Sequence, residues 1–75
     1  MSIHHGAALV VTESHGFYTA RVTIDRIPQP DPQAHVVFRE SVSAVGTEEE
    51  LREELNRRAR RKAEALHIGN IEGIV

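Results

Sequence analysis

The chain has 75 residues, a formal net charge of −2 and no cysteine. This length allows one small domain, residues 1–75, and the lack of cysteine excludes disulfide bridges and thiolate zinc sites. The weak negative charge excludes the strong positive field that draws proteins to nucleic acid without sequence preference.

So short a chain has a thin hydrophobic core, because a domain of about 60 residues buries only about 60% of the surface that its unfolded form exposes. Below about 70 to 80 residues, natural domains commonly add disulfides, a metal or a partner subunit. With disulfides excluded, we expect self-association as a homodimer, or binding to another protein.

The N-terminal sequence MSIHHGAALVV has no cationic segment, and its apolar run is too short for a signal peptide or a membrane span. We therefore predict a cytoplasmic protein without a membrane partner, and a flexible N terminus over residues 1–6. If Met1 is removed, the order Ser2, Ile3, His4 resembles the amino-terminal motif that binds Cu(II) or Ni(II). So short a motif arises by chance in many chains, and we predict no metal site and no cofactor.

Three strands are expected in the first part of the chain. Residues 7–13 and 17–27 are rich in β-branched residues and are separated by the turn residues Ser14, His15 and Gly16, which predicts a hairpin. The prolines within residues 28–33 remove backbone donors, so this segment is expected to be a stiff connector. Residues 34–42 form the third strand, with Val36, Phe38 and Val42 expected on the apolar face and Val37 on the other.

One helix is expected over residues 47–67. Thr47 and Glu50 have the spacing of a capping box, and Gly69 is expected to end the helix in a left-handed conformation. One side of the helix is apolar and includes two alanines that allow close packing on a sheet: Leu51, Leu55, Ala59, Ala63 and Leu66.

Charges along this helix run from acidic to basic, which suits the helix dipole. We expect ion pairs between residues four apart: Glu53 with Arg57, Glu54 with Arg58, and Arg60 with Glu64. Arg61 and Lys62 have no such partner. Together with Arg21 and Arg39 of the sheet, they are the candidate contacts for nucleic acid.

The elements together predict an α+β fold of β-β-β-α(-β) order, with a three-stranded antiparallel sheet and one long α-helix packed on one face. Residues 71–75 are expected to form either a short fourth strand or a docked tail. This arrangement resembles the three-stranded DNA-binding domains of the phage-integrase arm-binding type, whose sheet enters the major groove. The resemblance is topological, covers about residues 7–67 and carries no family motif, and the acidic net charge departs from it.

No catalytic motif organises the polar residues, so we expect a protein that is not an enzyme. Two functions remain open. The first is a small protein-binding or self-associating module that uses exposed apolar residues: Phe17, Val37, Ile71, Ile74 and Val75. The second is a nucleic-acid-binding domain of βββα type with a local basic patch.

Overall fold

The computed structural model describes residues 3–25, 32–44 and 46–72. It contains strands β1 (Ile3–Ser14), β2 (Phe17–Ile24) and β3 (Ala34–Ala44), helix α1 (Glu48–Ala65) and strand β4 (Asn70–Glu72). The predicted α+β class and the β-β-β-α order are confirmed, and a short fourth strand is present. Of the Pro-rich connector, residues 28–31 lie outside the described residues, while residues 32–33 form a turn.

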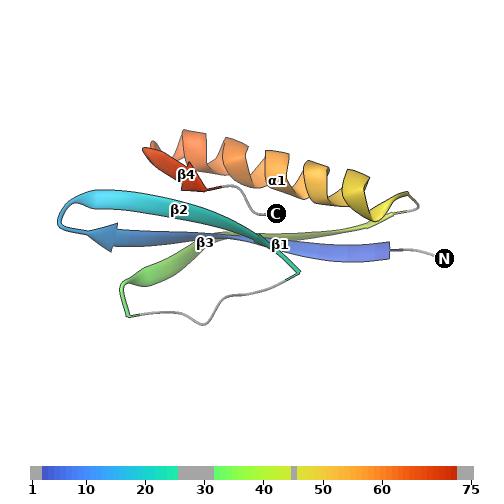
Figure 1. Ribbon diagram of the computed structural model, residues 1–75, viewed down its shortest axis with the longest axis horizontal. Helices are drawn as coiled ribbons and strands as arrows, with labels where there is room; N and C mark the ends of the chain where they lie inside the picture. Colours follow the sequence, from blue (N-terminus) through green and yellow to red (C-terminus); the bar gives the residue numbers. More distant parts are fainter. Residues whose placement is uncertain (1–2, 26–31, 45, 73–75) are drawn as a thin grey trace.

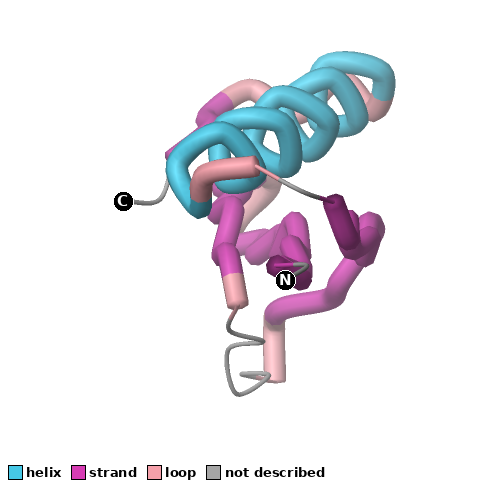
Figure 2. The backbone as a smooth tube through the Cα atoms, turned by 90° about the vertical axis from the view of Figure 1, so that its right-hand side faces the viewer, coloured by secondary structure: helices cyan, strands magenta, loops and turns pink. Residues whose placement is uncertain are grey.

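The strands form one sheet in the order β3-β1-β2-β4, with β1 antiparallel to both β2 and β3 and with β4 parallel to β2. Helix α1 lies along one side of this sheet (Figures 1 and 2). No described element covers the opposite side, which we call the open face. Within the described residues, no helix has the length and hydrophobicity that a membrane crossing requires.

The tight hairpin between β1 and β2 is confirmed. Ser14 pairs with Phe17, and the two residues between them, His15 and Gly16, have positive φ angles of 51° and 82°. A two-residue turn with both φ angles positive has a twist that matches the twist of the flanking strands. Glycine adopts this conformation at no steric cost, whereas His15 adopts it at some cost.

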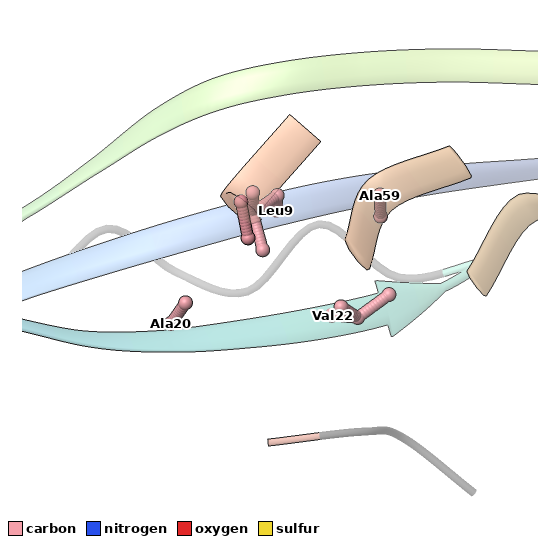
Figure 3. Close-up of a cluster of buried hydrophobic side chains, with 5 residues drawn as sticks. Leu9, Ala20, Val22 and Ala59 are labelled. Atoms are coloured by element: carbon pink, nitrogen blue, oxygen red, sulfur yellow. The ribbon is translucent and has the colours of Figure 1, made fainter. Parts of the chain in front are cut away.

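The core lies between α1 and the central pair of strands. Leu9 of β1 and Val22 of β2 are both fully buried, and they pack with Ala59 of α1 (Figure 3). The small side chains of Ala59 and Ala63 let the helix backbone approach the sheet closely, as the sequence predicts. Leu55 extends the same contact toward the N terminus of the helix, where it packs with Ala7 and Ile24.

A β-bulge corrects the predicted faces of β3. Leu9 pairs with Phe38 and Val10 pairs with Val36, so Val37 is the extra residue of the bulge. The two valines therefore exchange sides relative to a regular alternation. Val37 packs against the core, whereas Val36 is exposed on the open face.

The N-terminal end of α1 agrees with the prediction, and the C-terminal end does not. The helix begins after Thr47, whose Oγ accepts a hydrogen bond from the Glu50 amide at 3.1 Å. Its last residue is Ala65, Leu66 is the C-cap, and the next residue, His67, has a φ of 57°. The amides of His67 and Ile68 donate to the carbonyls of Glu64 and Ala63, both at 3.1 Å, which is a Schellman motif.

The prediction that Gly69 supplies the left-handed cap is therefore wrong, because His67 holds that position two residues earlier. The physical reason is the apolar contact that accompanies the motif: Ile68, directly after His67, packs against the core cluster that contains Ala63.

Candidate functional site

Of the predicted self-association residues, the structure describes Phe17, Val37 and Ile71. Phe17, next to the hairpin turn, is 75% exposed. Val37 and Ile71 instead pack against the core, because the bulge turns Val37 inward and Ile71 sits in β4 beside Ala20. Ile74 and Val75 lie outside the described residues. A patch built from all five residues therefore stays a prediction, in which Val37 and Ile71 are partly buried and Phe17 is exposed.

The predicted basic residues lie on two different sides of the molecule. Arg21 and Arg39 are on the open face, where their backbone partners on β1 are Val10 and Ala8. Arg61 is on the outer side of α1, since it lies midway between the sheet-facing Ala59 and Ala63 and the helix advances about 100° per residue.

The four cations also differ in whether they form an ion pair with a carboxylate. Arg21 faces Glu72 of β4, with 3.4 Å between Nε and Oε2. Arg39, Arg61 and Lys62 form no ion pair within the described part of the chain. The structure therefore brings no two of the unpaired cations together except the neighbours on α1.

Ion pairs along α1 follow the prediction only in part. Glu54 accepts from both Arg58, at 2.9 Å, and Arg57, at 2.8 Å, so the expected pair of Glu53 with Arg57 is wrong. Arg60 bonds Asn56 at 3.3 Å and not Glu64. The hydrogen bond from Arg58 is the largest of the effects that hold the pKa of Glu54 below its usual value.

Arg58 also connects the helix to the edge of the sheet. Its Nη1 donates to Glu40 of β3 at 2.6 Å, while its Nε donates to Glu54. The hydrogen bonds that Arg58 donates to Glu54 and Glu40 raise the pKa of Arg58 above its usual value. The negative charge of Glu40 on β3 is thus balanced by an ion pair with Arg58 of α1.

The outer edge of β3 is the longest unpaired backbone surface of the described chain. β3 has 11 residues and pairs only with β1, whereas β4 covers part of the opposite edge of the sheet. From Phe38 to Ala44 the register with β1 is regular, and the segment contains no proline and no lysine. Short length, proline, bulges and charged side chains, lysine above all, protect edge strands from pairing with other chains. Of these devices, the segment from Phe38 to Ala44 carries two charged residues, Arg39 and Glu40. The bulge protects only the first part of β3.

A shallow groove of about 320 Å³ lies where α1 ends over the sheet. Its walls are mostly apolar and include Val37, Leu66 and Ile68, with His35 and His67 as polar members. The helix pattern predicted that Leu66 packs in the core with the other apolar residues of α1. This prediction is wrong, because Leu66 is 44% exposed.

The first turn of α1 lies beside a polar cluster that the sequence did not reveal. His5 is buried in β1, and its Nδ1 is hydrogen-bonded to Oδ2 of Asp25, the residue that follows β2. The Gly6 amide donates to the other oxygen of Asp25 at 3.1 Å, and the Asp25 amide donates to the Gly6 carbonyl at 2.7 Å. Together these bonds hold Asp25 at a φ of 61°.

The electrostatics of Asp25 follow from these neighbours. Partial burial acts to raise the pKa of its carboxyl, but the hydrogen bonds from His5 and Gly6 outweigh this effect and lower the pKa overall. The positive charge of Arg52 on α1 acts in the same direction.

Residues 3–6 were expected to be flexible, yet they form the start of β1 and pair with the end of β3. The signal that reveals His5 is the alternation of β1: counting back from the buried Leu9 through Ala7 reaches His5 on the same face. His4 points the other way and is exposed. A Cu(II) or Ni(II) motif at the N terminus requires the backbone amides of Ile3 and His4, so it competes with the pairing of β1.

Comparison of the chain with known protein families, with curated proteins and with solved structures finds no match.

Proposed function

We propose that this chain is a small, non-enzymatic self-associating module in which β3 pairs with β3 of a second copy. The observation that carries the proposal is the open edge of β3, regular from Phe38 to Ala44 and without proline or lysine. Pairing satisfies backbone donors and acceptors along this edge, and it adds buried surface to a core that is thin for a chain of this length.

The segment itself indicates the register of this pairing. Its midpoint is Ser41, and a two-fold axis there places Ser41 opposite its copy, Arg39 opposite Ser43, and Glu40 opposite Val42. No like charges then face each other directly, whereas an axis at Arg39 or at Glu40 opposes two like charges. On each copy, the charge of Glu40 is balanced by its ion pair with Arg58.

A two-fold axis perpendicular to the sheet gives one continuous eight-stranded sheet, with both α1 helices on the same side. The open faces of the two copies also join into one wider face. This geometry follows from the antiparallel pairing of two identical edge strands.

A cysteine at position 41 tests the proposal directly, because the chain has no cysteine of its own. Opposite residues in an antiparallel pair have Cα atoms about 4.5 to 5.5 Å apart, within the range of a disulfide. We expect Ser41→Cys to form a covalent dimer within minutes in oxidised glutathione at micromolar protein concentration.

The matched control is Thr19→Cys, because Thr19 is also exposed on the open face but lies on β2. We expect this variant to cross-link only at the slow rate of random collisions. Equal rates for the two variants would show that β3 does not pair with itself.

Nucleic-acid binding is the second candidate function, and the unpaired Arg39 on the open face favours it. Titration of labelled duplex and single-stranded oligonucleotides at low salt tests it, since phosphate contacts give an affinity that falls steeply as salt rises. If Arg39 contacts phosphate, Arg39→Ala weakens binding and lowers the salt dependence. Absence of binding at low salt removes this candidate.

A further inference from the structure

Three side chains that can bind a metal ion converge at the first turn of α1. A ring nitrogen of His5 and one carboxylate oxygen each of Asp25 and Glu48 lie within 4.8 Å of one another. They come from β1, from the residue after β2 and from α1, so the fold and not a local sequence motif brings them together.

His5 is the residue that distinguishes this cluster from an ordinary group of surface acids. Its side chain is 8% exposed, and its Nδ1 is directed at the carboxylate of Asp25, so a largely buried imidazole presents one ring nitrogen to the cluster. Asp25 and Glu48 are more accessible, with side chains 37% and 60% exposed, so an ion can enter from solvent.

We propose that His5, Asp25 and Glu48 form a binding site for one divalent transition-metal ion, of which zinc is the representative. One imidazole and two carboxylates form a ligand set that suits zinc, with bonds of about 2.0 to 2.2 Å. Three protein ligands leave a coordination position for water or for an exogenous ligand.

The ion takes the place of the proton between His5 and Asp25, and the two carboxylates balance its charge. The Gly6 amide, which already donates to the second oxygen of Asp25, keeps that carboxylate oriented toward the ion. The exposed side chain of Glu48 reaches the ion by a change of its conformation.

Arg52 is the competitor for this site. Its Nε lies 3.3 Å from Glu48 and is buried without a hydrogen-bond partner within the described residues. Metal binding releases Glu48 from this pair. Neutralising the competitor with Arg52→Gln therefore strengthens metal binding, whereas a purely structural ion-pair cluster gains no metal affinity from the same change.

The test is titration of the full chain, freed of metal with a chelator, with zinc chloride and with cobalt chloride. We expect one zinc ion per chain by calorimetry, a rise in the melting temperature, and the visible absorption of Co(II) in a site of low coordination number. Since ligand binding to the folded state raises stability by mass action, the melting temperature must increase with zinc concentration.

Glu48→Gln is the informative variant, and Glu49→Gln is its matched control, because Glu49 is exposed in the same helical turn but outside the cluster. We expect Glu48→Gln to weaken zinc binding at least tenfold, Glu49→Gln to leave it unchanged, and Arg52→Gln to strengthen it. The proposal fails if the wild-type chain binds no zinc at millimolar concentration, or if Glu48→Gln and Glu49→Gln bind zinc equally well.

Discussion

The end of α1 gives a sharp test of the fold, because the structure and the sequence pattern assign its left-handed residue to different positions. The structure places His67 there, with a φ of 57°, and Gly69 outside that region. A residue with a side chain in this conformation costs roughly 1 to 2 kcal/mol. Glycine removes that cost but loses about 0.5 to 1 kcal/mol through its greater freedom in the unfolded chain.

We therefore expect His67→Gly to stabilise the protein by about 0.5 to 1 kcal/mol. For a domain of this size, that raises the melting temperature by about 2 to 8 °C. Little packing is lost, since His67 is exposed. Thermal unfolding followed by circular dichroism measures the change.

Gly69→Ala completes this test. An added Cβ at Gly69 meets no atom within 4 Å, so the variant is expected to match or slightly exceed the wild-type stability. If His67→Gly instead lowers the melting temperature while Gly69→Ala destabilises the chain by about 1 kcal/mol, the helix ends at Gly69 and the reasoning is wrong.

Two further predictions concern the bulge and the ion pairs of α1. Val37→Asp places a carboxylate against the core and should cost about 2 kcal/mol, whereas Val36→Asp on the exposed side should cost less than about 0.5 kcal/mol. Urea unfolding measures both, and equal losses would contradict the bulge. The pKa of Glu54 is lowered in the folded state, so its stabilising effect is present above its unfolded pKa, about 4.3, and is lost as pH falls through the folded pKa. Glu54→Gln should therefore lower the melting temperature at pH 7 and have little effect at pH 3, while Glu53→Gln, which removes no ion pair, should show no such pH dependence.

The sequence predicted the elements whose signals are local. The hairpin follows from His15 and Gly16, and the start of α1 follows from the spacing of Thr47 and Glu50. The sheet-facing side of α1 follows from the helical spacing of Leu51, Leu55, Ala59 and Ala63, which are all buried. Each of these patterns lies within one element, so its period can be read without knowledge of the rest of the fold.

The features that sequence reasoning missed depend on contacts between distant segments. The bulge at Val37 is set by the pairing of β3 with β1. His67 takes the left-handed position because Ile68 packs on the core. The cluster of His5, Asp25 and Glu48 requires β1 to begin at Ile3, whereas a flexible N terminus was predicted over residues 1–6. Among the predicted association residues, Val37 packs on the core side of the sheet for the same reason, since a β-branched residue suits either face.

The most direct test of self-association is the mass of the wild-type chain in solution, measured by sedimentation equilibrium over a range of concentrations. Pairing along β3 predicts a mass that rises with concentration from that of the 8.4 kDa chain to twice that value and then stops, because a two-fold interface between edge strands closes on itself. A mass of 8.4 kDa at every concentration up to the millimolar range would contradict the proposed function.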